Sequence, residues 1–91
     1  MRKTLKSLEY DRLIDLLVAA RHASGIRQQK LAAKLGKPQS FIAKYEGGER
    51  RIDVIEFIAI ARALDADPIG LFREFVAGET PSKPKRKIPA K

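Results

Sequence analysis

Apolar residues recur every three or four positions in five short stretches of this chain, and this helical periodicity limits the fold more than any other feature. Near the start, positions i, i+3, i+4 and i+7 of one helical face are Leu13, Leu16, Leu17 and Ala20. No stretch alternates apolar and polar residues for long enough to predict a strand. We therefore expect an all-α domain of five helices around one core.

Residues that start or stop helices bound each stretch. We expect helices over about residues 7–23, 28–35 and 38–45, a fourth that begins after Asp53, and a fifth over about residues 69–77. The predicted starts are a Ser7 cap, Pro38 at the first helical position, the capping box of Asp53 and Glu56 inside a hydrophobic staple of Ile52 and Phe57, and Asp67 followed by Pro68. The predicted ends are Gly25, Gly36 and Gly78.

The same spacing predicts the rest of the core and the extent of the domain. Inward positions of the later helices are Leu31, Ala32, Leu35, Ile42, Tyr45, Phe57, Ile60, Ala61 and Leu64. Residues 1–79 should form one domain. Residues 80–91 hold three prolines, five cations and the isolated apolar residue Ile88, so they should be a disordered basic tail.

The composition excludes several classes of function. The chain has no cysteine and a single histidine, His22, which excludes thiolate chemistry and histidine metal clusters. No paired carboxylates or glycine-rich phosphate loop can be named, so we expect no enzyme, no cofactor and no metal. No apolar run reaches the roughly 18 residues of a membrane span, and no signal peptide is evident. We expect a soluble, cytoplasmic protein with no membrane partner.

The net charge of +8 is unevenly distributed along the chain. Residues 1–52 carry 12 basic and 5 acidic side chains, residues 53–80 carry 2 and 6, and residues 81–91 carry 5 basic and no acidic ones. A basic first half beside an acidic second half is expected of a surface that meets a polyanion on one side only. The alternative is a solvated surface with an accidental excess of lysine.

Residues 28–47 have the pattern of two helices that cross at a steep angle through a tight turn. Such a pair needs a small residue where the backbones approach, a glycine at the turn and apolar residues on the facing sides. Ala32 is the small residue and Gly36 is the turn glycine. The facing apolar residues are Leu31, Leu35, Ile42 and Tyr45. This is the spacing of a DNA-binding helix-turn-helix, which we place at about residues 28–46.

Over about residues 8–77 the chain resembles the Cro/C1-type (XRE-like) helix-turn-helix family of phage and bacterial regulators. The matching positions are Arg21, Gly25, Gln28, Leu31, Ala32, Leu35, Gly36, Ser40, Ile42, Tyr45, Glu46, Gly48, Ile60, Ala61 and Leu64. The resemblance implies a compact, lambda-repressor-like domain that binds double-stranded operator DNA as a homodimer, with its third helix in the major groove. It implies a repressor associated with the nucleoid, and we expect no small-molecule ligand domain.

The third helix presents a face suited to reading bases. With Ile42 and Tyr45 on the buried side, the opposite side carries Gln39, Ser40, Ala43 and Lys44. The Gln39 amide can bond adenine, Lys44 can reach guanine or a phosphate, and Ala43 can contact a thymine methyl. By resemblance, Gln39, Ser40 and Lys44 match base-contacting positions, and Gln28 matches a phosphate contact. The alternative is the solvated face of an amphipathic helix.

Sequence-independent contacts to phosphates should come from cations that precede and follow the third helix in the sequence. These are Arg27, Lys30, Lys37, Arg50 and Arg51. Six to eight contacts of this kind predict a salt slope of about −5 to −7. Any one of these cations can instead serve solubility alone.

Four positions depart from the family pattern. Arg27 stands where a hydroxyl N-cap is common, and Gln29 and Lys30 stand where acidic residues are common. The second helix loses a cap worth about 1 kcal/mol, but its start is more cationic. Phe41 stands where a polar residue is common. It could stack on a base, contact a thymine methyl or cover the core, and we favour the last.

The fifth helix carries more apolar residues than one core stripe can use. Such a surplus is typical of a partner surface. We expect a homodimer through Ile58 of the fourth helix and Leu71, Phe72, Phe75 and Val76 of the fifth, with two recognition helices about one DNA turn apart. The alternative is that these residues cover the core from a terminal helix.

Other functions fit the same fold. An antitoxin or a protein-binding adaptor would use it to bind a protein, although the cationic, proline-rich residues 80–91 are poor material for a folded clamp. A controller of a restriction–modification system is a variant of the regulator that the sequence does not separate from a repressor. The KPKRK run of the tail resembles a nuclear-localisation cluster, but in a bacterial-type domain we favour a DNA-sliding arm or a solubility tail.

Overall fold

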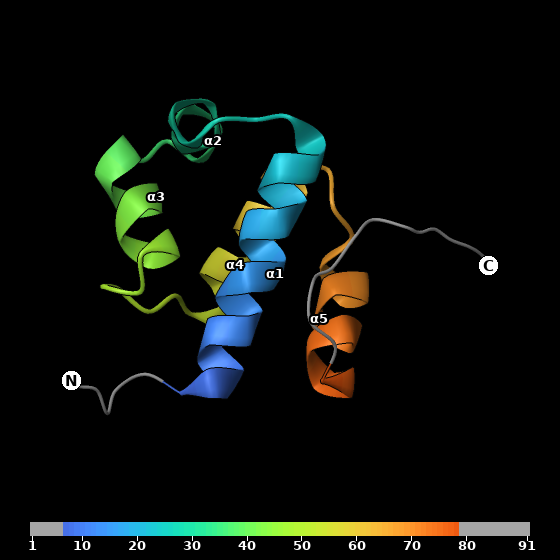
Figure 1. Cartoon of the computed structure of the whole chain (residues 1–91). Coiled ribbons are helices and arrows are strands. Elements are labelled where there is room, and N and C mark those ends of the chain that lie inside the picture. Colours follow the sequence, from blue (N-terminus) through green and yellow to red (C-terminus); the bar gives the residue numbers. More distant parts are fainter. Residues whose placement is uncertain (1–6, 79–91) are drawn as a thin grey trace.

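The computed structural model describes residues 7–78, which form five helices and no strand (Figure 1). The helices are α1 (Leu8–Ser24), α2 (Gln28–Leu35), α3 (Gln39–Glu46), α4 (Val54–Ala63) and α5 (Pro68–Ala77). The predicted all-α architecture is therefore confirmed. None of these helices is both long and apolar enough to cross a membrane. The predicted basic tail at residues 80–91 lies outside the described residues.

The predicted caps start three of the helices. Ser7 Oγ accepts a hydrogen bond from Tyr10 N at 3.0 Å. At α4, Asp53 Oδ1 accepts from Glu56 N at 2.7 Å and Glu56 Oε1 accepts from Asp53 N at 2.9 Å, which completes the capping box. The Asp67 side chain accepts from Ile69 N, with Pro68 in the first turn of α5. These bonds satisfy backbone donors that no helical carbonyl can reach.

The start of α3 differs by one residue from the prediction. Pro38 is the N-cap rather than the first helical residue, and its φ of −70° and ψ of 155° are extended. The proline ring restricts φ but leaves ψ free, so it suits either position. Arg27 caps α2 without a side-chain hydrogen bond, as expected of a poor cap.

Helices α1, α2 and α4 end in the same hydrogen-bonded turn, but α4 uses an unusual residue. Gly25 and Gly36 have φ of 76° and 68°, in the left-handed region that favours glycine. At the end of α4 this position is Asp65, with φ of 59°. Asp65 N donates to Arg62 O at 3.0 Å and Ala66 N donates to Ala61 O at 2.9 Å. This pair of bonds is a Schellman motif. Its left-handed residue is usually glycine, and the backbone of any other residue is strained there.

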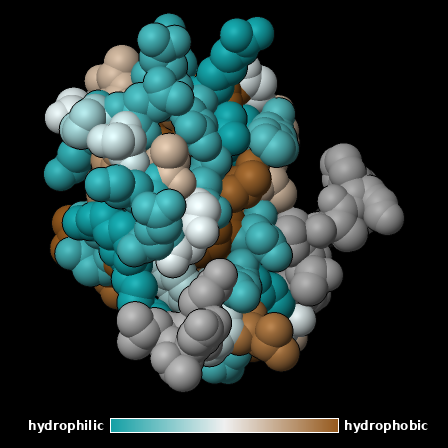
Figure 2. Space-filling view, turned by 60° about the vertical axis from the view of Figure 1, so that its left-hand side comes forward, coloured by the Kyte–Doolittle hydropathy of each residue, from teal (hydrophilic) through white to brown (hydrophobic). Residues whose placement is uncertain are grey.

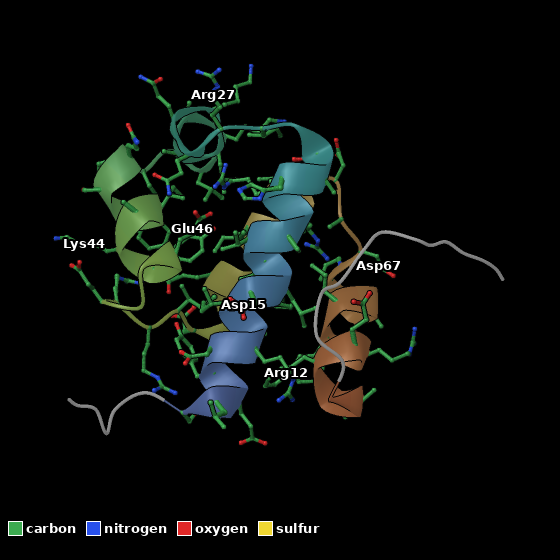
Figure 3. All side chains as sticks on the ribbon, in the orientation of Figure 1. Arg12, Asp15, Arg27, Lys44, Glu46 and Asp67 are labelled. Carbon is green, nitrogen blue, oxygen red and sulfur yellow. The ribbon has the colours of Figure 1, made fainter. Side chains whose placement is uncertain are left out.

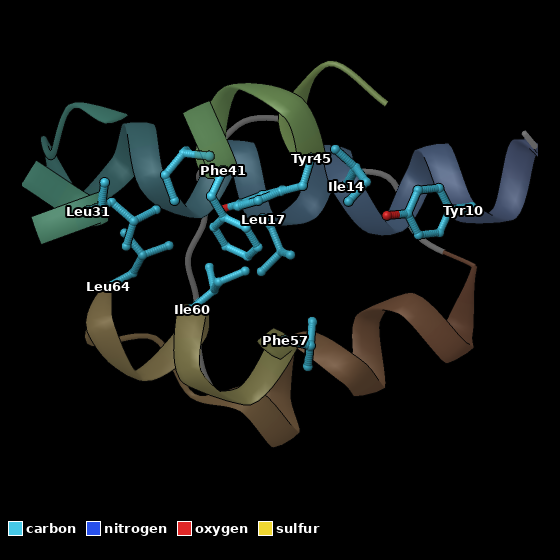
Figure 4. Packing of buried hydrophobic residues seen from close by; sticks show 11 residues of the cluster. Tyr10, Ile14, Leu17, Leu31, Phe41, Tyr45, Phe57, Ile60 and Leu64 are labelled. Carbon is cyan, nitrogen blue, oxygen red and sulfur yellow. The ribbon is translucent and has the colours of Figure 1, made fainter. Parts of the chain in front are cut away.

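The core lies where α1, α2, α3 and α4 meet (Figure 4). Its most deeply buried side chains are Tyr45, Leu17, Leu31, Ile42 and Ile60. The buried face of α1 is wider than predicted because this helix contacts α3, α4 and α5. Its buried residues are Tyr10, Ile14, Leu16 and Leu17, whereas Leu13 and Ala20 are only partly buried, as is Leu35 of α2.

Helices α3 and α5 lie on opposite sides of α1 (Figure 1). Among the described helices, α5 contacts only α1 and α4, while α2 and α3 contact each other. Arg12 of α1 ties the end of α5 in place, since its guanidinium donates to Phe75 O at 3.0 Å and lies 5.3 Å from the centre of the Phe75 ring. Figure 3 shows Arg12 between the two helices. The surface of α3 is thereby separated from the surface of α5.

Candidate nucleic-acid interface

The outer face of α3 is polar and open to solvent. Its exposed side chains are the four predicted base readers, Gln39, Ser40, Ala43 and Lys44. On the inner face, Ile42 and Tyr45 are each 0% exposed. Lys44 points away from the body of the domain in Figure 3, and the side of the molecule that carries α3 is mostly hydrophilic in Figure 2. The core therefore fixes which side of α3 can meet a ligand.

Phe41 closes the core at the border of this face. It is 9% exposed and packs edge-to-face on Tyr45, with ring centres 5.5 Å apart. The prediction that Phe41 covers the core is confirmed. Two cations lie over its ring, Lys37 Nζ at 5.3 Å and Arg50 Cζ at 4.8 Å from the ring centre. The aromatic ring thus holds two positive charges beside α3.

A chain of hydrogen bonds links α1 to the first residues of α2 and α3. Arg21 Nε and Glu46 Oε2 are 2.7 Å apart in an ion pair whose side chains are 11% and 8% exposed. Gln28 Nε2 donates to Glu46 Oε1 at 2.9 Å, and Gln39 Nε2 donates to Gln28 Oε1 at 3.4 Å. Figure 3 shows Glu46 between α3 and α1. This chain orients the Gln28 and Gln39 amides before any ligand is present.

Sequence reasoning noted Arg21 and Glu46 as family positions but did not predict that they pair. They lie 25 residues apart, so helical periodicity carries no signal for their contact. Neighbouring Tyr45 has a buried hydroxyl without a partner among the described residues. Burial raises the pKa of Tyr45, and the Glu46 carboxylate raises that pKa further, so the phenol stays neutral at physiological pH.

Five of the six predicted phosphate contacts fall into two groups, one on each side of α3. Arg27, Gln28 and Lys30 lie at the start of α2, beside Gln39. Lys37 and Arg50 lie on the other side, over Phe41. We call these groups the α2 flank and the Phe41 flank. A major groove about 12 Å wide has a phosphate backbone on each side, so two flanks match its geometry.

The loop from α3 to α4 is tied to α1 by Tyr10. The Tyr10 hydroxyl accepts from Ile52 N at 3.1 Å and donates to Arg50 O at 3.4 Å. Arg51 lies over the Tyr10 ring, with Cζ 4.2 Å from the ring centre. Arg51 thus lies over a ring of α1 rather than over Phe41, a contact that the sequence did not predict.

Arg50 already has a carboxylate partner. Its two terminal nitrogens donate to the two oxygens of Glu56, each at 3.0 Å. These bonds raise the pKa of Arg50. The Arg50 guanidinium, together with the backbone N–H of Asp53, holds the pKa of Glu56 below its usual value.

A second surface, between α4 and α5, is apolar. A groove of about 580 Å³ lies there, and its walls include Leu13, Val54, Phe57, Ile58, Ile69 and Phe72. Two of these residues are largely exposed, Val54 and Ile69 at 67% each, and Phe72 is about half exposed at 49%. Ile55, at 73% exposure, follows Val54 at the start of α4. An exposed apolar groove of this kind is typical of a partner surface.

The structure divides the residues predicted to form a dimer. Phe72 and Val76 are exposed and Ile58 lines the groove. Leu71 instead packs against the core, and Phe75 lies under Arg12 of α1, so neither is on the open side of α5. The two rows arise because residues three or four apart share one side of a helix. The outer row is Ile69, Phe72 and Val76.

Helices α2 and α3 contact each other across the tight turn at Gly36, and this pair is a helix-turn-helix whose second helix exposes a polar face. A family model described as helix-turn-helix matches residues 17–71. The chain belongs to the helix-turn-helix family of the Cro/C1 (XRE) type, as the sequence resemblance predicted. Comparison with curated proteins found no match.

Solved structures share this fold. An XRE-family like protein from Pseudomonas syringae pv. tomato str. DC3000 is 50% identical over 77% of this chain and 85% of its own, with a TM-score of 0.75. The restriction-modification controller C.AhdI from Aeromonas hydrophila is 29% identical over 72% of this chain and 100% of its own, with a TM-score of 0.65. The controller C.Esp1396I is 18% identical, with a TM-score of 0.72, and shows the likeness of fold alone.

Proposed function

We propose that this protein is a homodimeric transcriptional repressor that binds double-stranded DNA in a sequence-specific manner, with α3 in the major groove. The observation that carries the proposal is the exposed row Gln39, Ser40, Ala43 and Lys44, held outward by the buried Ile42 and Tyr45. The coarser conclusion, a DNA-binding regulator rather than an enzyme, follows from the family.

Each exposed residue of α3 has a distinct role in this proposal. The Gln39 amide donates to and accepts from the edge of an adenine, and its bond to Gln28 sets its orientation. Lys44 reaches a guanine acceptor, Ser40 bonds a base edge, and the small Ala43 lets the helix approach a thymine methyl. The α2 flank and the Phe41 flank contact phosphates on opposite sides of the groove and give register without sequence preference.

We assign the apolar groove between α4 and α5 to the dimer. A second copy can place the outer row of its α5, Ile69, Phe72 and Val76, against Val54 and Ile58 of the first. No residue of α3 lines the groove, and α5 lies on the opposite side of α1 from α3 (Figure 1), so dimerisation leaves both recognition helices free. A protein of the same fold, C.Esp1396I, was solved as a tetramer in complex with its natural 35 base-pair operator, and assembly on DNA is thus compatible with the fold.

Repression is the mode of action that binding alone produces. A small dimer bound at a promoter occupies one side of the duplex and excludes other proteins from that site. The proposal needs no ligand, because binding depends on protein concentration alone. The position of the operator relative to the promoter then decides which genes respond.

Selection of bound sites from a random duplex library tests this function directly. The full chain should enrich a palindromic site whose half-sites are about one DNA turn apart. A palindrome supports both sequence reading and the dimer, whereas an enriched single half-site would contradict the dimer. No enrichment at all would contradict the regulator and favour a protein-binding role.

A further inference from the structure

The carboxylate of Glu56 joins two parts of the molecule that otherwise have separate roles. As the third residue of α4, it accepts a hydrogen bond from Asp53 N at 2.9 Å and completes the capping box. The same carboxylate accepts two hydrogen bonds from Arg50, each at 3.0 Å. A residue that starts α4 thus also holds a cation of the Phe41 flank.

Arg50 is fixed in place but remains accessible. Its guanidinium lies 4.8 Å from the centre of the Phe41 ring, and one nitrogen donates to Arg51 O at 2.9 Å. Its side chain is 42% exposed, against 20% for that of Glu56. These contacts use three of the five N–H groups of a guanidinium. A phosphate that arrives beside Arg50 can therefore still accept from it.

The pair changes the charge that this flank shows to DNA. Lys37 and Arg50 supply two positive charges over Phe41, and Glu56 cancels one of them. Non-specific binding depends on the net cations that replace counterions along the duplex. Specific binding depends in addition on base contacts. These fix the position of the duplex and so keep one of its phosphates next to Arg50. A carboxylate at this place should weaken the first kind of binding more than the second.

We propose that Glu56 is a specificity-determining residue, which pairs with Arg50 and thereby lowers the affinity for random DNA more than the affinity for the operator. This inference rests on the proposed DNA-binding function. It gives the carboxylate a role beyond that of a helix cap. Arg50 is then partly neutralised by Glu56 in the free protein, and a phosphate binds it fully only when base contacts fix the position of the DNA.

The substitution Glu56→Gln separates the two roles, because glutamine also completes a capping box. Binding of the full chain would be measured by fluorescence anisotropy over a salt series, with a random-sequence 30-base-pair duplex and with the duplex enriched from the library. We expect the affinity for the random duplex to rise about 5- to 10-fold at low salt, with a salt slope steeper by about 1. The affinity for the enriched duplex should rise less than about 3-fold, because its base contacts already place the phosphate.

Two controls show whether Arg50 transmits the effect. Glu49→Gln removes the same charge from an exposed position in the loop that carries Arg50, and it should raise random-duplex affinity less than Glu56→Gln does. When Arg50 is already replaced by Gln, adding Glu56→Gln should also raise the affinity for the random duplex less than it does in the native chain. Thermal unfolding of each variant checks that the fold is intact.

Several results would overturn the inference. One is a loss of affinity for both duplexes in Glu56→Gln. Another is a rise in random-duplex affinity in Glu49→Gln that equals the rise in Glu56→Gln. A third is an effect of Glu56→Gln on that affinity that stays the same when Arg50 is also replaced by Gln. If the native chain binds neither duplex at low salt, the proposed function itself fails and the role of Glu56 fails with it. Binding by the native chain that Glu56→Gln leaves unchanged would overturn only the role of Glu56.

Discussion

The exposed face of α3 and the grooved face between α4 and α5 differ in how favourably water solvates their side chains. On the α3 face the exposed side chains are mostly polar, and Gln39 is joined through Gln28 and Glu46 to α1. On the other face Val54, Ile69 and Phe72 expose apolar surface around a groove. Water solvates the first face well, whereas apolar surface in water costs about 25 cal/mol per Å². The first face is therefore stable without a ligand, and the second gains free energy when it is covered.

The largest expected effect comes from a charge on the apolar face. Ile69→Glu should weaken the dimer by about 1,000-fold, or about 4 kcal/mol, because each copy would bury a carboxylate without a partner. Ile69 is 67% exposed and lies in the first turn of α5, where a glutamate suits the helix dipole, so the monomer should stay folded. Sedimentation equilibrium measures the change. Glu74→Lys, exposed on the side of α5 away from the outer row, should leave the dimer intact. A native chain that sediments as a monomer would contradict the assignment of the apolar face to a dimer.

The next largest effect tests whether the α3 face is held by its buried ion pair. Glu46→Ala leaves the Arg21 guanidinium, at 11% exposure, without its carboxylate partner and should destabilise the domain by about 3 kcal/mol. For a domain of this size the melting temperature should fall by more than about 10 °C. Glu49→Ala is the matched control at an exposed position and should change little. Equal melting temperatures for the two variants would show that the pair does not hold this face.

A smaller effect tests sequence reading on the same face. Gln39→Ala should cost about 1–3 kcal/mol at one base pair of each half-site, because the bidentate amide is lost. Repeated library selection should show the preference at that position disappearing while the others remain. Lys30→Ala, on the α2 flank, should weaken all sites alike and flatten the salt slope by about 1. A uniform loss for Gln39→Ala would assign this residue to phosphate rather than to a base.

The smallest effect is expected away from both faces. Asp65→Gly should raise the melting temperature by a few degrees, because glycine relieves about 1–2 kcal/mol of strain at a φ of 59°. The larger entropy of glycine in the unfolded chain offsets about 0.5–1 kcal/mol of this gain. DNA affinity and dimerisation should not change, because Asp65 is outside α3 and outside the groove. Asp65→Ala keeps the Cβ atom and should give no gain. A gain with alanine would trace the effect to the lost charge instead of the backbone.

Local signals in the sequence predicted most of the fold. Gly36 and the apolar residues around it predicted the observed bounds of α2. The Asp53–Glu56 capping box predicted where α4 begins. The Asp65 turn was missed because glycine is the usual signal for a left-handed residue. Pro38 was misplaced by one residue because a proline fits both the N-cap and the first helical position.

The candidate site was less predictable, because its geometry depends on contacts between distant residues. Periodicity identified the outer side of α3, but it could not pair Arg21 with Glu46 or Arg50 with Glu56. The surplus of apolar residues on α5 was real. Its division into an inner row with Leu71 and Phe75 and an outer row with Phe72 depends on how α5 docks on α1. Such docking is a property of the folded chain and leaves no mark on a single helix.

The Tyr10 hydroxyl, which bonds Ile52 N and Arg50 O, has a consequence for the rate and cost of binding. A loop that is ordered only on contact with DNA loses conformational entropy at that moment, about 1–2 kcal/mol for each backbone residue that becomes fixed. Here that entropy is lost during folding, when α1 anchors the loop. The Phe41 flank then meets DNA in one shape, so more of its contact energy is retained as affinity.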